Sequence, residues 1–308
     1  MKIDLDLDLA GLSPEDWRQQ VDDIGEEHGY YQSVGRDHAA LFIDAGSNLL
    51  VTFENRAAAM SAPFGRPRGF DMVTREGWSL LNILADGETW FRGPEVFGYF
   101  DRLVDEGFLE DFDNVLFFGA HDAGYAAAAY SVTAPGARAL LLRPVATLDP
   151  AMTGWDKRFA EHRRLDFTSR YGYAPDMIEA LEEAYVIYDP TQAPEAMHAA
   201  LYRRPNVTYL PARRAKPRVE TMLDGMRLTA PLMKAAMAGT LDELSFARAW
   251  RGRRDAPGYV RNLLKRTIVD DRPGLAARVC AYGMRTADAE FYEARLDDIV
   301  EASDAAIA

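Results

Sequence analysis

The stretch with the most chemical potential covers residues 115–130 and reads VLFFGAHDAGYAAAAY. A short apolar run, typical of a buried strand, leads into a turn of glycine and alanine. An alanine-rich segment follows, which favours helix. Small residues let the backbone turn steeply and raise one side chain at the carboxyl end of a strand. The residue raised by this elbow is expected to be His121, with Asp122 beside it.

Two kinds of chemistry fit this pair. His121 can act as a base, a nucleophile or a metal ligand with Asp122, Asp149 or Asp189, because an imidazole titrates near pH ~6.5. Alternatively, Asp122 is the nucleophile. Small residues stand two positions before it, at Ala120, and two positions after it, at Gly124, so the same pattern fits one residue later in the chain. A histidine from elsewhere is then the base. An oxyanion hole would use the amide of Asp122, whose carboxylate opposes a developing anion if it points inward. A carboxylate there also favours the helix dipole.

The elements that position this pair alternate between strand and helix from residue 40 to residue 210. This pattern predicts an α/β fold with a mainly parallel sheet and helices on both faces, and ligands outside the carboxyl ends of the strands. Residues 40–44 and 49–54 are expected to be a hairpin or adjacent strands, and 55–78 a loop. Residues 1–9 fit a half-exposed strand or an acidic tail that docks loosely. Further strands are predicted over 80–84, 115–118, 137–142, 184–189 and 206–210, and helices over 14–27, 94–110 and 194–202.

Beyond residue 219 the sequence predicts helices alone. We expect them over residues 222–237, 241–250, 259–268, 273–284 and 288–302. The resulting domain organisation is an N-terminal extension (1–34), an α/β domain (35–225) with an insertion or cap at 151–180, and a helical C-terminal region (226–308).

Composition limits the classes of partner. The chain has 308 residues and a net charge of −13, which argues against binding nucleic acid or anionic lipid. A single cysteine, Cys280, excludes an internal disulfide and a multi-cysteine metal site. The N-terminus lacks the features of a signal peptide, and no run is apolar enough to span a membrane. We therefore expect a cytoplasmic protein without nucleic-acid or membrane partners.

The run from Leu49 to Asp149 resembles the α/β-hydrolases, and is most similar to the branch found beside polysaccharide-processing genes. The similar segments are LLVTFEN, DGETW, FFGAHDAGYAAAAYS and LLLRPVATLDP. The family pattern at the elbow is G-x-S-x-G, whereas this chain has His121 in place of serine and Ala123 in place of the second glycine. Similar proteins also carry the label phosphoadenosine phosphosulfate reductase. The Glu-Cys-Gly-type motif that this label implies is absent, because Cys280 lies in RVCAY.

The resemblance implies a catalytic acid after a late strand, at Asp189, with Asp149 as the second choice. It also implies a histidine base after the last strand. Residues 211–218 contain no histidine, and the nearest is His198 on the preceding predicted helix. Both the serine and the histidine of a triad are therefore missing from their expected positions.

We expect a small acidic or carbohydrate-like ligand, or a protein partner bound through the C-terminal helices. The basic run at residues 213–218 is either an anion site or a solvated loop. No metal-ligand spacing joins His28, His38 and His162, so neither a metal nor a cofactor is predicted. The predicted ligand-binding residues are Asn55, Gly119, Tyr125, Asp149, Arg213 and Arg214.

The function predicted from the sequence is that of an α/β-hydrolase-like protein with a degenerate triad, acting by binding. The alternative is a hydrolase or acyltransferase that uses His121 or Asp122 at the elbow together with Asp189.

Overall fold

The structure is a computed structural model that describes residues 3–215, 218–285 and 289–305. The chain forms two compact units, and each is described by itself. The first contains residues 1–213 and 229–243, and the second contains residues 214–228 and 244–308. The domain limits expected from the sequence remain a prediction. Two structural facts bear on them: residues 29–34 are a strand of the main sheet, and residues 229–237 are a helix of the first unit.

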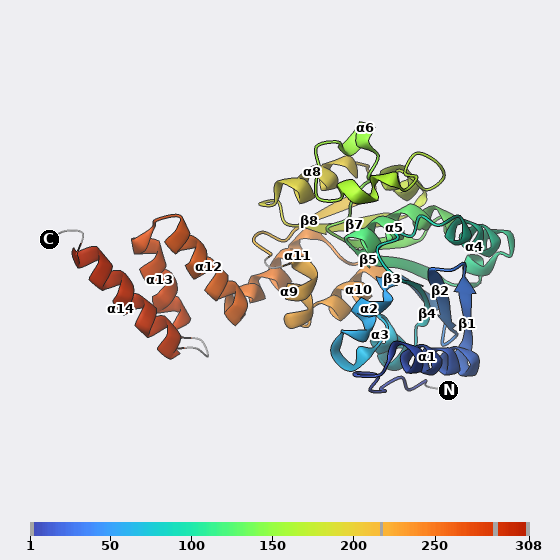
Figure 1. Cartoon of the computed structure of the whole chain (residues 1–308), viewed down its shortest axis with the longest axis horizontal. Coiled ribbons are helices and arrows are strands. Elements are labelled where there is room, and N and C mark those ends of the chain that lie inside the picture. The colour runs from blue at the N-terminus through green and yellow to red at the C-terminus, as the bar shows by residue number, and fades with distance from the viewer. Residues whose placement is uncertain (1–2, 216–217, 286–288, 306–308) are drawn as a thin grey trace. The chain divides into compact units, whose positions relative to one another are not determined.

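An eight-stranded sheet forms the centre of the first unit, in the order β1-β2-β4-β3-β5-β6-β7-β8 (Figure 1). β1 and β2 pair antiparallel, β2 pairs antiparallel with β4, and all later neighbours are parallel. The predicted α/β class with a mainly parallel sheet is therefore confirmed. The strands are β1 (Gly29–Val34), β2 (His38–Ile43), β3 (Asn48–Asn55), β4 (Ser79–Ala85), β5 (Asn114–Ala120), β6 (Arg138–Leu142), β7 (Glu183–Tyr188) and β8 (Val207–Pro211).

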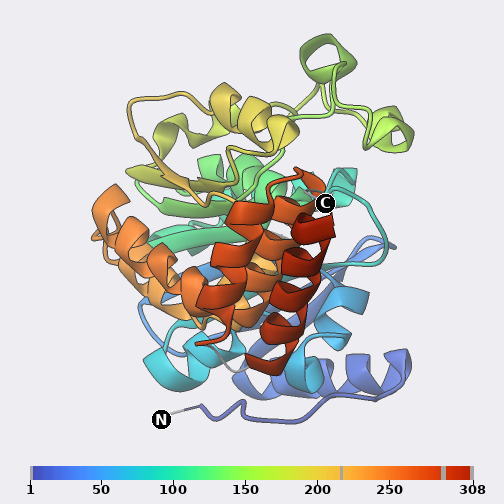
Figure 2. The same cartoon turned by 90° about the vertical axis from the view of Figure 1, so that its left-hand side faces the viewer.

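The central strands are apolar on both faces because helices cover both. On one face Phe53 and Phe117 belong to the core that includes the buried alanines of α5. On the other face Leu50 and Leu80 lie so close to Gly69, at the start of α3, that a methyl group there would meet both. Figures 1 and 2 show the sheet between these layers. The helices of this unit are α1 (Pro14–His28), α2 (Arg56–Met60), α3 (Phe70–Glu76), α4 (Pro94–Asp105), α5 (Asp122–Tyr130), α6 (Pro150–Thr153), α7 (Ala174–Met177), α8 (Ala193–Leu201) and α10 (Thr229–Met237).

The second unit is built from helices, with no strand among its described residues. It contains α9 (Val219–Gly225), most of α11 (Glu243–Trp250), α12 (Pro257–Val269), α13 (Pro273–Gly283) and α14 (Ala289–Ala305). Its core joins the last three helices through Val260, Leu264, Ala276, Cys280 and Tyr292. Figures 1 and 2 both show α12, α13 and α14 side by side. The helical C-terminal region predicted from the sequence is thus confirmed.

Three local predictions were wrong. β2 and β3 are not neighbours, because β4 lies between them and pairs with both. Residues 55–78 are not one loop, since α2 and α3 lie there. The helix expected over 222–237 is two helices, because Arg227 between them has a left-handed backbone with φ 56°.

The N-terminal segment is a docked chain with no strand among its described residues. Leu5 and Leu9 are buried, and the Leu9 amide donates to the Phe64 carbonyl at 2.8 Å. Arg66 forms an ion pair with Asp6 at 2.6 Å. Within the described residues, no helix is both long enough and apolar enough to cross a bilayer.

The turn from β5 into α5 gives the first testable prediction. A Cβ on residue 119 would lie 2.1 Å from the Ala123 carbonyl oxygen, which is backbone and cannot rotate away. We expect Gly119→Ala to lower the free energy of unfolding by about 3 kcal/mol, measured by urea denaturation. The matched control is Gly98→Ala on α4, where a Cβ meets nothing within 4 Å. That control should raise the free energy of unfolding by at most about 1 kcal/mol, and equal effects of the two changes would contradict the prediction.

Candidate functional site

The elbow lies at the carboxyl end of β5, where the sequence placed it. His121 joins β5 to α5 with φ 62° and ψ −113°, a conformation that is uncommon for a residue with a side chain. Its amide donates to the Leu142 carbonyl at 2.9 Å, and its carbonyl accepts from the Tyr125 amide at 2.9 Å. Backbone contacts on both sides thus hold the residue in this strained geometry and raise its side chain.

Aromatic side chains pack against the imidazole of His121. Its ring centroid lies 4.8 Å from that of Phe159 and 5.6 Å from that of Trp90. The side chain of His121 is 21% exposed to solvent. Phe159 comes from the segment predicted to be a cap, and Trp90 follows β4. Aromatic packing therefore encloses much of the ring while leaving one part accessible.

Asp122 is the polar partner of His121. The Nδ1 of His121 lies 3.4 Å from the Oδ1 of Asp122, which is a long contact for a hydrogen bond. Burial opposes ionisation of this carboxyl. Hydrogen bonding and charge from His121, together with the backbone amides of Ala123 and of Asp122 itself, outweigh burial and lower its pKa. The carboxylate lies in the first turn of α5, where its negative charge favours the helix dipole.

The two candidate acids are both engaged in local turns. Asp189 is buried at the end of β7, and its Oδ1 accepts from the Thr191 amide at 2.9 Å and the Thr191 hydroxyl at 2.8 Å. Asp149 caps α6, where its Oδ1 accepts from the Ala151 amide at 2.9 Å. Asp189 makes further interactions besides these. The Asp149 carboxylate thus caps a helix and the Asp189 carboxylate stabilises an Asx turn, and both roles are structural.

His198 is buried and both of its ring nitrogens are used. Nδ1 accepts from the Ala146 amide at 3.2 Å, so Nε2 carries the proton and donates to Asp156 at 3.0 Å. Arg158 binds the same carboxylate through two of its nitrogens, at 2.7 to 3.2 Å. Asp156 was not a candidate from the sequence, because no spacing relates it to His198, 42 residues away.

The pKa values of this buried pair follow from its surroundings. Burial lowers the pKa of His198, and the neighbouring Asp156 offsets this only in part. Burial disfavours the Asp156 carboxylate, yet hydrogen bonds from Arg158 and His198 hold its pKa well below the usual range. A neutral His198 beside an ionised Asp156 ties α8 to the segment before residue 160. This arrangement leaves no ring nitrogen for general-base work at the elbow.

The predicted ligand-binding residues do not form one group. Asn55 caps α2 and donates to the Gly87 carbonyl at 2.9 Å. Tyr125 is buried, and its hydroxyl donates to the Tyr171 carbonyl at 2.8 Å. Gly119 lies in the turn from β5 to α5, where there is no space for a side chain. Arg213 follows β8 and is an exposed residue of the first unit. Arg214 lines a cavity of the second unit.

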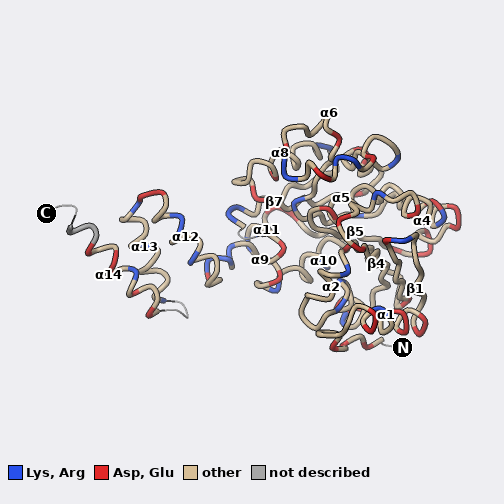
Figure 3. The backbone as a smooth tube through the Cα atoms, viewed as in Figure 1, with Lys and Arg blue, Asp and Glu red and all other residues tan. Residues whose placement is uncertain are grey.

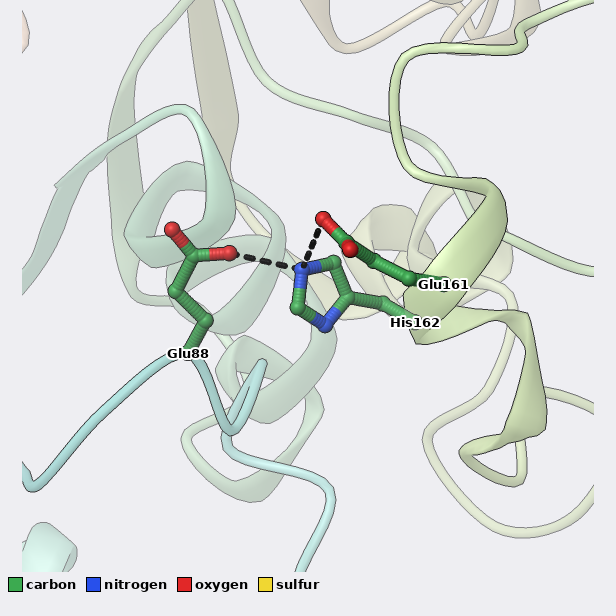
Figure 4. A group of neighbouring side chains, drawn as sticks. All are labelled: Glu88, Glu161 and His162. Carbon is green, nitrogen blue, oxygen red and sulfur yellow. Dashed lines mark ion pairs between the residues drawn. The ribbon is translucent and has the colours of Figure 1, made fainter.

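One group of side chains has the chemistry of a metal site (Figure 4). Nε2 of His162 lies 2.6 Å from Oε2 of Glu88 and 3.6 Å from Oε1 of Glu161. The two carboxylates are 72% and 79% exposed. A nitrogen with two carboxylate oxygens suits a divalent cation. The contact at 2.6 Å is equally that of an ion pair, which would fix the loop after β4 to the segment around residue 162. The spacing of the histidines in the sequence gave no indication of this group.

Comparison with known proteins gives distant likenesses only. No protein-family model matches the chain, and no curated protein matches it. Among solved structures, a Pyrococcus furiosus esterase is 12% identical over 64% of this chain and 85% of its own, with a TM-score of 0.39. The capsule O-acetyltransferase of Neisseria meningitidis serogroup A is 10% identical over 67% and 94%, with a TM-score of 0.42. A Pyrobaculum calidifontis esterase is 13% identical over 74% and 94%, with a TM-score of 0.43.

The buried histidine gives a prediction for stability against pH. The pKa of His198 is lower in the folded protein than its unfolded value near 6.5, so the unfolded chain binds more protons below that pH. The free energy of unfolding should therefore fall as the pH drops from about 7 to about 5, measured by urea denaturation. His198→Gln should make this fall shallower. His38, whose pKa burial also lowers, should supply the rest.

The matched control is Gln192→Asn at the start of α8, which removes no ionisable group and should leave the slope unchanged. An identical slope in the wild type and in His198→Gln would show that His198 does not titrate as its burial requires.

Proposed function

We propose that this protein acts by binding and not by hydrolysis, on a hydrolase-like scaffold whose elbow has lost its triad. Its ligand is a small acidic or carbohydrate-like molecule or a protein partner. The observation that carries this proposal is the position of Asp122, whose carboxylate lies in the first turn of α5 beside His121.

The chemical reason lies in the charge that acyl transfer develops. A tetrahedral intermediate places a negative oxygen against the amide that follows the raised residue. In this chain that amide belongs to Asp122, whose own carboxylate has a lowered pKa and carries negative charge on the same residue. A second negative oxygen there would be repelled by this carboxylate. This opposes ester and amide hydrolysis at the elbow.

The other members of a triad support the same proposal. His198 has both ring nitrogens engaged, and Asp189 accepts from Thr191. Phe159 and Trp90 pack against the ring of His121, and this packing reduces the access of a substrate to its nitrogens. The accessible part of His121 and the exposed Arg213 lie at the carboxyl ends of parallel strands, where α/β proteins bind ligands.

The second candidate is a hydrolase or acyltransferase that uses His121 or Asp122. One observation favours it, namely that His121 keeps a strained backbone and remains partly exposed beside a carboxylate. Strain of this kind is concentrated at functional sites.

Assays of a panel of activated esters and one haloalkane separate the two candidates. We expect the purified protein to turn over none of them faster than about twofold above buffer. His121→Ala and Asp122→Asn should give the same rates, with folding checked by circular dichroism. Turnover that disappears in one correctly folded variant would name the working residue and overturn the binding proposal.

A further inference from the structure

The second unit contains a cavity of about 390 Å³. Its walls come from α12, α13, the segment before α12, and Arg214. All of its lining residues belong to that unit, so the cavity does not depend on the elbow. Its volume lies in the range of about 300 to 1,000 Å³ that is typical of small-molecule sites.

The floor of the cavity is apolar. Tyr259, Val260 and Leu263 of α12 line it. Leu275, Val279 and Tyr282 of α13 lie at spacings of three and four residues, which place them on one helix face. Val260 is buried, while Leu263 and Val279 are half-buried. The two helices thus present a hydrophobic surface to whatever enters.

The rim is strongly basic. Five arginines line the cavity against a single acidic residue, Asp270, although the whole chain carries a net charge of −13. Figure 3 marks the basic positions of α12 and α13 in blue. Two of these arginines come from basic runs that lie about 40 residues apart in the sequence and that the fold brings together. The five are Arg214, Arg254, Arg266, Arg272 and Arg278.

Most of this positive charge has no partner within the described residues. Arg266 lies 3.4 Å from Asp270, and both side chains are about half exposed. Within residues 3–215, 218–285 and 289–305, the other four have no carboxylate within 4.0 Å. Like charges gathered around one hollow repel each other unless an anion enters. Guanidinium groups bind phosphate, sulfate and carboxylate through paired hydrogen bonds.

We propose that this cavity is a binding site for a small amphiphilic anion, with its phosphate, sulfate or carboxylate head at the arginine rim and its apolar body on the floor of α12 and α13. Charge complementarity selects the head and the apolar floor selects the body. The site is separate from the elbow, so it stands whether or not the elbow hydrolyses substrates.

Calorimetric titration of the full chain with octyl phosphate, below its micelle concentration, tests this proposal. We expect saturable binding at least about tenfold tighter than that of inorganic phosphate or of octanol, because each of these probes uses only one part of the site. Binding of octyl phosphate should weaken as sodium chloride is added. No saturable heat at millimolar octyl phosphate, or equal affinity for inorganic phosphate, would overturn the proposal.

Variants locate the binding. Arg254→Gln and Arg278→Gln each remove one exposed guanidinium from the rim, and each should weaken octyl phosphate binding by about tenfold. The matched control is Arg248→Gln on α11, an exposed arginine outside the cavity lining, which should leave binding unchanged. Equal weakening by all three variants would mean that net charge alone attracts the probe, and the site would be refuted.

Discussion

The close approach of backbone to backbone at the β5–α5 turn is the constraint on which the first unit depends. The space beside residue 119 is filled by the Ala123 carbonyl, and Gly124 lies against Gly119 and Pro144 with little room to spare. This contact directs α5 back across β5 and β3, where its buried alanines let helix and sheet approach closely. The same turn forces His121 into a left-handed conformation. The packing of α5 on the sheet therefore requires this sharp turn, whichever side chain is present at position 121.

That requirement separates shape from chemistry. An elbow that catalyses acyl transfer keeps its first helical amides available for an oxyanion. Here the first of those amides belongs to Asp122 itself, and the neighbouring His121 lowers the pKa of the Asp122 carboxyl, so a negative charge already stands at this position. The imidazole of His121 is packed by Trp90 and Phe159. The strain at the turn is therefore explained by packing, and it does not by itself argue for catalysis.

The alternation of apolar runs and helical segments predicted the fold class well. A strand that is buried on both faces of a sheet is apolar along most of its length, and such runs can be recognised in the sequence. The alternation could not predict that β4 enters between β2 and β3, since strand order depends on how segments distant in sequence meet. The position of His121 could be predicted from the small residues around it. The role of His198 could not, because its partner Asp156 and the Ala146 amide come from loops that only the folded chain brings together.

The two units balance charge in opposite ways. At the elbow a helix start, which attracts anions, has the protein's own Asp122 in its first turn. In the second unit five arginines line an apolar hollow, in a chain with a large excess of acid. Within the described part of the chain, Arg266 is the one of the five with a carboxylate within 4.0 Å, that of Asp270. An acidic protein has many carboxylates with which such arginines could pair at the surface. A rim left largely without them, above a hydrophobic floor, is the arrangement expected where the missing negative charge arrives with a ligand.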